Sequence, residues 1–261
     1  MIKELENINL YIFDLDGTIY IGNKEIDGAF DTIKKLRAMG KKVCFFTNNS
    51  SRNHTEYIKK FADMGLDISE NEIYTSGQAT CEWLLDNYKQ SKVFLLGNPA
   101  LQAEFIEYGI TLDEENPDIC VVAFDTSLEY GRVYNFCKKL YKHEKTLYVA
   151  THPDESCPAE ECPMPDVGAI IDLIKDTICR EPDVIIGKPF ESAGDRIQKR
   201  FNVYKENIAM VGDRLNTDIA FGNNCGFKSI LVLSGETDKE MLSKSQIKPS
   251  IVLNSVKDIV G

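Results

Sequence analysis

Short apolar runs alternate with segments of helical periodicity along nearly the whole chain, and this rhythm constrains the fold more than any other feature. The first units are a strand expected at Ile8–Phe13, an amphipathic helix at 28–39 and a second strand at 42–46. The segment 51–64 repeats the helical pattern and ends at a glycine. Strands separated by helices are typical of βαβ units, so the sequence predicts an α/β fold with a parallel sheet.

The same rhythm continues in the rest of the chain. Further strands are expected at 93–96, 119–124, 147–150, 184–186, 208–211 and 230–233, with helices after Pro99, at 128–141 and at 167–178. Four prolines between residues 153 and 165 interrupt the pattern and predict a long loop. A length of 261 residues suffices for one large domain or two modest ones.

The charge balance limits the class of partner. The chain has 30 basic and 41 acidic residues, a formal charge of −11, which argues against nucleic acid or an anionic membrane surface as a partner. The first residues lack the apolar core of a signal peptide, and no window approaches the ~20 apolar residues of a membrane span. We therefore expect a soluble cytoplasmic protein whose eight scattered cysteines are free thiols in the core.

Two aspartates follow the first predicted strand. Asp14 and Asp16 are two residues apart, so on an extended chain their carboxylates point the same way at the carboxyl end of the strand. Open α/β sheets bind ligands at that end. Neighbouring carboxylates repel each other, which favours a hard divalent cation such as Mg²⁺ between them. The alternative is an ordinary turn, because Asp and Gly commonly follow strands.

Polar residues follow three further strands. Thr47 and Asn48 begin a segment whose hydroxyl, amide and backbone N–H groups could hold an anion. Lys188 closes the run 184–187, and Asp213 follows 208–212, with Asp218 five residues later. Each position has an ordinary explanation on its own, as a helix cap, a surface lysine or an acid at a helix start. Together they supply the nucleophile, acid/base, donors, cation and metal carboxylates that phosphoryl transfer requires.

These four segments, in this order, resemble the four motifs of the haloacid dehalogenase-like (HAD) superfamily. Their spacing, and the long insert before Lys188, resemble its subclass IIA, the NagD and 4-nitrophenylphosphatase type. The resemblance implies a Rossmann-like parallel-sheet core formed by residues 1–78 and 183–261. It also implies an inserted α/β cap at 79–182 that governs substrate choice.

The resemblance further implies an activity. The expected function is a Mg²⁺-dependent phosphatase that hydrolyses a small phosphorylated metabolite, a sugar phosphate, phosphoglycolate or nucleotide, through an aspartyl-phosphate. Relatives with this cap often associate through it, so analogy suggests a homodimer.

Each motif residue takes its role from the resemblance. Asp14 is expected to be the nucleophile, and Asp16 the general acid and base. Thr47, Asn48 and Lys188 are expected to bind the phosphoryl group. The expected Mg²⁺ ligands are Asp14, Asp16 through its backbone carbonyl, and Asp213, with Asp218 acting indirectly.

Two segments of the expected cap resemble substrate-facing regions of the family. The first contains Phe124 and Asp125, and the second contains His152 and Asp154, where the family pattern has Asn in place of His152. His152 with Cys157 and Cys162 suggests zinc as an alternative, but their spacing matches no compact zinc site.

Two other functions remain open on the sequence. A non-catalytic, receiver-like module would be phosphorylated at Asp14 for signalling, and would leave Asp16, Asp218 and the cap unexplained. A phosphomutase would keep the covalent chemistry and pass the phosphoryl group to a sugar.

Overall fold

The computed structural model describes residues 2–159 and 161–260, which form two compact units. The first unit comprises the described residues of Met1–Thr47, His54–Tyr74 and Lys188–Gly261. The second unit comprises those of Asn48–Asn53 and Thr75–Gly187. The chain therefore leaves the first unit briefly after Thr47, and again for the long stretch that ends at Gly187.

The first unit is built on a six-stranded sheet in the order β15-β14-β13-β1-β4-β5. The strands are β1 (Leu10–Phe13), β4 (Lys42–Thr47), β5 (Ile73–Thr75), β13 (Ile208–Gly212), β14 (Lys228–Val232) and β15 (Ile251–Leu253). The strand β1 pairs in parallel with both β13 and β4, and β14 pairs in parallel with β13 and β15. A short antiparallel hairpin, β2 (Tyr20–Ile21) and β3 (Lys24–Glu25), follows β1. Parallel neighbours place their carboxyl ends at one edge of the sheet.

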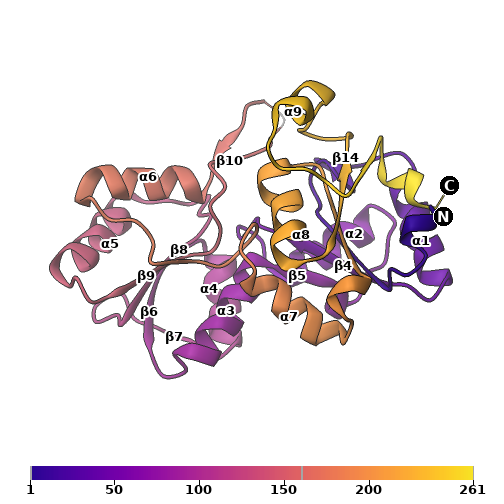
Figure 1. Ribbon diagram of the computed structural model, residues 1–261. Helices are drawn as coiled ribbons and strands as arrows, with labels where there is room; N and C mark the ends of the chain where they lie inside the picture. Colours follow the sequence, from indigo (N-terminus) through magenta and orange to yellow (C-terminus); the bar gives the residue numbers. More distant parts are fainter. Residues whose placement is uncertain (1, 160, 261) are drawn as a thin grey trace. The chain divides into compact units, whose positions relative to one another are not determined.

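Helices cover both faces of this sheet (Figure 1). They are α1 (Ala29–Ala38), α2 (His54–Asp63), α7 (Ser192–Phe201) and α8 (Ala220–Cys225). A further helix, α9 (Lys239–Lys244), lies between β14 and β15 in the sequence and has no buried residue. Short helical turns lie at Lys3–Leu5, Glu70–Glu72, Lys205–Asn207 and Val256–Ile259, and a π-helix, η4, at Leu215–Ile219. Successive strand residues face opposite sides, so Phe45 packs on Phe61 of α2 and Phe46 on Phe221 of α8.

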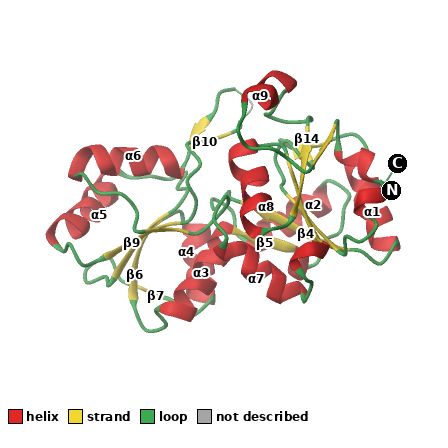
Figure 2. Ribbon diagram, viewed as in Figure 1, coloured by secondary structure: helices red, strands yellow, loops and turns green. Residues whose placement is uncertain are grey.

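The second unit has a five-stranded parallel sheet in the order β12-β9-β8-β6-β7 (Figure 2). Its strands are β6 (Lys92–Leu96), β7 (Thr111–Leu112), β8 (Ile119–Val122), β9 (Leu147–Ala150) and β12 (Val184–Ile185). Its helices are α3 (Ser76–Asn87), α4 (Pro99–Glu107), α5 (Tyr130–Lys142) and α6 (Val167–Ile178), with α5 and α6 on one side of the sheet and α3 and α4 on the other. An antiparallel hairpin, β10 (Ser156–Cys157) and β11 (Met164–Pro165), precedes α6.

The predicted α/β fold with parallel sheets is confirmed, while several element boundaries differ. The helix expected at 51–64 begins only at His54, and the expected proline-rich loop contains the hairpin β10–β11. The strand β12 pairs with β9 in the second sheet, whereas the predicted boundary at residue 183 grouped it with the chain's last segment. The unit boundaries lie after Tyr74 and Gly187, and 48–53 belongs to the second unit.

The composition led to expectations about membrane-spanning helices and about the cysteines. None of the described helices has the length and apolarity needed to cross a membrane. All eight cysteines are free thiols. Five of them are buried as expected, but Cys162 and Cys179 are exposed and Cys157 is half-buried.

Candidate active site

Three aspartates gather at the carboxyl edge of the first unit's sheet. Asp14 directly follows β1 and Asp213 directly follows the neighbouring strand β13, while Asp218 lies in η4. One carboxylate oxygen from each lies within 4.8 Å of the others. The side chain of Asp14 is 14% exposed, while Asp213 and Asp218 are buried. About 200 positions separate Asp14 from Asp213 and Asp218 in the sequence, and the parallel pairing of β1 with β13 brings them together.

Lys188 lies between two of these carboxylates. Its Nζ atom donates hydrogen bonds to Asp14 Oδ1 at 2.6 Å, to Asp218 Oδ1 at 2.7 Å and to the carbonyl of Phe46 at 3.1 Å. Burial by itself lowers the pKa of Lys188, but the charges of Asp14 and Asp218 and their hydrogen bonds outweigh it and raise the pKa. The lysine is therefore a fixed cation beside Asp14.

The carboxylates repel one another despite this cation. Burial, followed by the charge of Asp218, raises the pKa of Asp14 well above its ordinary value, although Lys188 opposes the shift. Burial and the charge of Asp218 also raise the pKa of Asp213, to about 7. Oxygen atoms that crowd together in this way are the ligands preferred by a hard divalent cation, which would relieve the repulsion. The donor set therefore fits such a cation.

Asp213 is held by the loop that follows β14. Its Oδ2 accepts a hydrogen bond from the backbone N–H of Glu236 at 2.7 Å, and its Oδ1 accepts one from Thr18 Oγ1 at 3.4 Å. A Cβ atom at Gly235 would lie 2.0 Å from Asp213 Oδ2, and one at Gly17 would lie 2.4 Å from it. A side chain at either position would therefore displace the Asp213 carboxylate, and Gly17 also has a φ of +86°, which favours glycine.

The loop after β14 lies outside the four segments that the sequence marks as motifs. Ser234 Oγ donates to the carbonyl of Gly17 at 2.8 Å, so the loop after β14 is also joined to the loop after β1. The signal that would have found it is the Ser-Gly pair at 234–235, which follows an apolar strand in the same manner as the motifs that were recognised.

The remaining predicted residues of the first unit lie near these. Asp218 Oδ2 accepts a hydrogen bond from the backbone N–H of Arg214 at 3.1 Å, so Asp218 is hydrogen-bonded through both oxygens, counting its contact with Lys188. Asp16 is half-buried in the turn after Asp14 and forms a β-bridge with Tyr20. Thr47 is buried at the carboxyl end of β4. The roles expected for these residues stay predictions.

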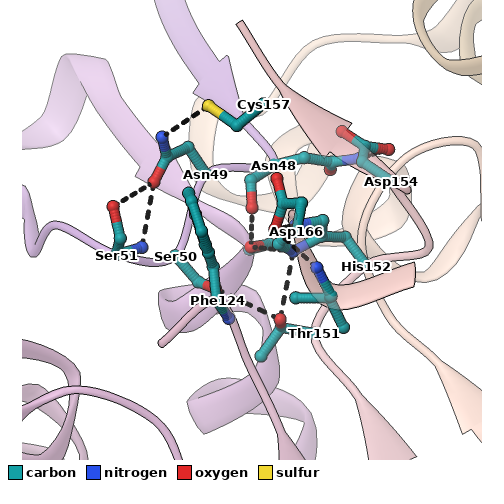
Figure 3. A network of polar contacts seen from close by, with 12 residues as sticks. Asn48, Asn49, Ser50, Ser51, Phe124, Thr151, His152, Asp154, Cys157 and Asp166 are labelled. Atoms are coloured by element: carbon teal, nitrogen blue, oxygen red, sulfur yellow. Dashed lines mark hydrogen bonds and ion pairs between the residues drawn. The ribbon is translucent and has the colours of Figure 1, made fainter. Parts of the chain in front are cut away.

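The other predicted site residues belong to the second unit. Asn48, its first residue, donates from Nδ2 to Asp154 Oδ1 at 3.1 Å (Figure 3). Its carbonyl accepts a hydrogen bond from Ser76 Oγ at 2.5 Å. The amide of Asn48 is therefore tied to the segment that follows β9, and its backbone is tied to the start of α3.

His152 is fully buried in the second unit, and both of its ring nitrogens lie within hydrogen-bond distance of polar side chains. Its Nε2 lies 3.0 Å from Asp166 Oδ1, and its Nδ1 lies 3.0 Å from Thr151 Oγ1. Asp166 also caps α6, since its Oδ1 accepts from the N–H of Val167 at 2.7 Å. Sequence reasoning did not identify Asp166, because 14 residues separate it from His152.

The cluster around His152 differs from the zinc alternative. Among the described residues, the groups within 4.8 Å that could share a cation with His152 are Asp154 and Asp166, not the two cysteines. The sulfur of Cys157 instead lies 3.5 Å from Asn49 Nδ2 and accepts its hydrogen bond (Figure 3).

Phe124 and Asp125 hold the loop after β8. The backbone N–H of Phe124 donates to Ser50 Oγ at 3.0 Å. Asp125 Oδ1 accepts from the N–H and the hydroxyl of Ser127, and its Oδ2 lies 3.4 Å from Arg132. The contact of these two residues with a substrate stays a prediction.

Comparisons with known proteins point to one family. Residues 11–111 match the haloacid dehalogenase-like hydrolases, and residues 185–259 match a second HAD-hydrolase-like family. The chain is 32% identical to an acid sugar phosphatase of Staphylococcus haemolyticus, over 98% of this chain and 95% of the relative. It is 31% identical to the chloroplastic phosphoglycolate phosphatase 1A of Arabidopsis thaliana, over 98% and 78%. The crystal structure of a 4-nitrophenylphosphatase from Thermotoga maritima matches with a TM-score of 0.95 and 41% identity, over 99% of this chain and 98% of that one.

Proposed function

Because the chain belongs to the haloacid dehalogenase-like hydrolases of subclass IIA, the NagD and 4-nitrophenylphosphatase type, we propose that it is a Mg²⁺-dependent phosphatase of small organic phosphate monoesters. The substrate class is a sugar phosphate, phosphoglycolate or nucleotide. The names of the relatives, an acid sugar phosphatase and a phosphoglycolate phosphatase, support this range.

Asp14 is the nucleophile in this proposal. One of its carboxylate oxygens attacks the phosphorus of the substrate, and the bond from phosphorus to the leaving oxygen breaks as the aspartyl-phosphate forms. Asp16 gives its proton to the leaving oxygen. It then takes a proton from the water that attacks the aspartyl-phosphate, which releases inorganic phosphate and restores Asp14.

The observation that carries the proposal is the position of Lys188 against Asp14. The 2.6 Å contact directs Asp14 Oδ1 and favours its ionised form, which the nucleophile needs. The same ammonium group offsets charge on the transferring phosphoryl group. Asp218 holds the lysine from its other side at 2.7 Å, so the cation is positioned before the substrate binds.

Asp14 and Asp213 would hold the Mg²⁺ ion, together with the backbone carbonyl of Asp16 and, indirectly, Asp218. When bound, the ion neutralises charge on the phosphoryl group and on the nucleophile. Gly17, Gly235 and the N–H of Glu236 keep the Asp213 carboxylate in one orientation for this purpose.

The second unit is proposed to act as the cap that selects the substrate. Its own parallel sheet and its own apolar cluster support an independent domain inserted into the core. Association into a homodimer through the cap, and a cytoplasmic location, complete the proposal.

Replacement of Asp14 tests the proposed function. Asp14→Asn should abolish Mg²⁺-dependent release of phosphate from 4-nitrophenyl phosphate, while the exposed Asp63→Asn control should retain the wild-type rate. A panel of sugar phosphates, phosphoglycolate and nucleotides, measured with the same variants, would name the preferred substrate. Undiminished turnover by Asp14→Asn would contradict the mechanism.

The same assays separate the two rival functions. A receiver-like module would keep a stable acyl phosphate and release no phosphate in multiple turnovers. A phosphomutase would yield an isomeric sugar phosphate and little free phosphate.

A further inference from the structure

A continuous chain of buried polar contacts crosses the second unit from the start of α6 to the segment 48–51 (Figure 3). His152 Nε2 lies 3.0 Å from Asp166 Oδ1, and His152 Nδ1 lies 3.0 Å from Thr151 Oγ1. Thr151 Oγ1 lies 3.2 Å from Ser50 Oγ, which accepts a hydrogen bond from the N–H of Phe124 at 3.0 Å. All five residues are at most 2% exposed.

One set of hydrogen-bond directions pairs every group in this chain. In it the Nε2 atom of His152 donates to Asp166 Oδ1, and Nδ1 of the neutral ring is an acceptor. Thr151 must then donate to Nδ1. Ser50 must donate to Thr151, and its oxygen remains an acceptor for the N–H of Phe124. In this arrangement each hydroxyl donates once and accepts once, so every member of the chain is paired.

Further contacts bind the same segment. Ser76 Oγ, which donates to the carbonyl of Asn48, lies 3.4 Å from His152 Nδ1. The N–H of Gly187 donates to the carbonyl of Thr151 at 2.8 Å. A Cβ atom at Gly187 would lie 2.6 Å from Asn48 Oδ1, so only glycine fits there.

Two of these residues are covalent neighbours of Thr47 and Lys188, which we expect to bind the phosphoryl group. Asn48 follows Thr47 directly, and Gly187 precedes Lys188. The cluster around His152 is therefore one peptide bond away from Thr47 and one peptide bond away from Lys188. Small errors in the position of phosphoryl-binding groups are costly, because this chemistry depends on positioning.

We propose that His152 is a positioning residue whose ring, oriented by Asp166, orders the segment 48–51 through Thr151 and Ser50, and that phosphoryl transfer requires this order. The inference rests on the proposed function. It gives His152 a role other than the substrate contact expected from the sequence.

Two substitutions of His152 test the contributions of its two ring nitrogens separately. In His152→Asn the amide oxygen takes the place of Nδ1 and can accept from Thr151. In His152→Gln the amide nitrogen reaches the place of Nε2, and the acceptor for Thr151 is lost. With 4-nitrophenyl phosphate we expect kcat to fall about tenfold in His152→Gln and by no more than about threefold in His152→Asn, with KM changed less than kcat in both.

Variants of Thr151 test the same chain one step further on. Thr151→Val should lower kcat as His152→Gln does, because it removes the hydroxyl at nearly constant shape, and Thr151→Ser should restore it. The exposed His143→Asn and Thr177→Val are the matched controls and should leave kcat unchanged. Thermal unfolding of each variant shows whether it is folded at the assay temperature.

The wild-type protein provides a test that needs no variant to fold. The chain has three histidines, so long-range ¹H–¹⁵N spectra can resolve each ring. We expect the His152 signals at pH 7.5 to show a protonated Nε2 and an unprotonated Nδ1. A protonated Nδ1, or wild-type kcat in folded His152→Gln and Thr151→Val, would overturn the inference. Turnover by Asp14→Asn would instead refute the proposed function, so the two failures are distinguishable.

Discussion

The Nζ atom of Lys188 lies 2.6 Å from Oδ1 of Asp14, although 174 residues separate the two in the sequence. Both side chains belong to the first unit, and the second unit accounts for most of the chain between them. The contact joins the proposed nucleophile to a buried cation that Asp218 also holds. The stability of the folded protein and the reactivity of Asp14 therefore both depend on the charges of Asp14, Lys188 and Asp218.

Removal of the lysine charge should affect both properties. In Lys188→Met the carboxylates of Asp14 and Asp218 lose their shared buried cation, so we expect kcat to fall at least about a hundredfold and the free energy of unfolding to fall by about 3 kcal/mol. Phosphate release and urea unfolding measure the two effects. The exposed Lys244→Met is the control. A Lys188→Met variant with activity within a few-fold of wild type would show that the cation is not needed.

The raised pKa of Asp213 predicts how stability depends on pH without metal. Burial and the charge of Asp218 raise this pKa to about 7, above its ordinary value in an unfolded chain. Between roughly pH 4 and 7 the folded state thus holds a proton that the unfolded state has released, and stability falls as the pH rises through that window. We would measure the Tm of wild type and of Asp213→Asn in EDTA at pH 5 and at pH 8. The decrease in Tm between these two pH values should be at least about 2 °C larger in wild type than in Asp213→Asn.

The same experiment includes its controls. Asp63→Asn, in which an exposed carboxyl is replaced, should follow the wild-type curve. Saturating Mg²⁺ should reduce the drop in wild type, because a bound cation offsets the repulsion that raises the pKa. Identical curves for wild type and Asp213→Asn would contradict this account of the acidic cluster.

The glycine contact on Asp213 predicts an effect on metal affinity. In Gly235→Ala the new Cβ atom would lie 2.0 Å from Asp213 Oδ2, so the carboxylate must move. We expect the Mg²⁺ concentration for half-maximal activity to rise at least about tenfold, which corresponds to about 1.4 kcal/mol. Gly131→Ala, at an open position in α5, should have wild-type metal affinity. Equal affinities in the two variants would show that Asp213 does not need its present orientation.

Removal of metal should stop turnover without unfolding the protein. Asp14 and Asp213 directly follow strands of the first unit's sheet, and these strands pair through their backbones. Chelation should therefore stop phosphate release but leave the far-UV circular dichroism of the protein unchanged. Added Mg²⁺ should restore the activity, and Ca²⁺ should restore less, because it accepts looser geometry at longer distances. Full activity after exhaustive chelation would exclude the proposed dependence on metal.

The sequence predicted the fold class and the first-unit cluster because both arise from local patterns. Asp14 and Asp213 follow apolar strands, and parallel strands place whatever follows them at one edge. Asp166 could not be found in this way, because its importance comes from a contact with His152, 14 residues away in the sequence. Gly235 does follow an apolar strand, in the Ser-Gly pair at 234–235, but its closeness to Asp213 arises only in the folded chain.

Domain boundaries were harder to predict for a related reason. Composition does not change at Asn48 or at Gly187, and the strand β12 reads as any other short apolar run. Its pairing with β9 determines the unit to which it belongs, and strand pairing depends on tertiary contacts.

The central claim is that Asp14 carries the phosphoryl group and that Asp16 is needed to release it. In Asp16→Asn, phosphoryl transfer from 4-nitrophenyl phosphate should continue, because 4-nitrophenolate leaves without a proton, while attack by water should slow. Rapid mixing should therefore show a burst of about one nitrophenolate per chain, and acid quenching followed by peptide mass analysis should find one phosphoryl group on Asp14. The absence of a burst together with an unmodified Asp14, or a phosphoryl group on another residue, would contradict the account.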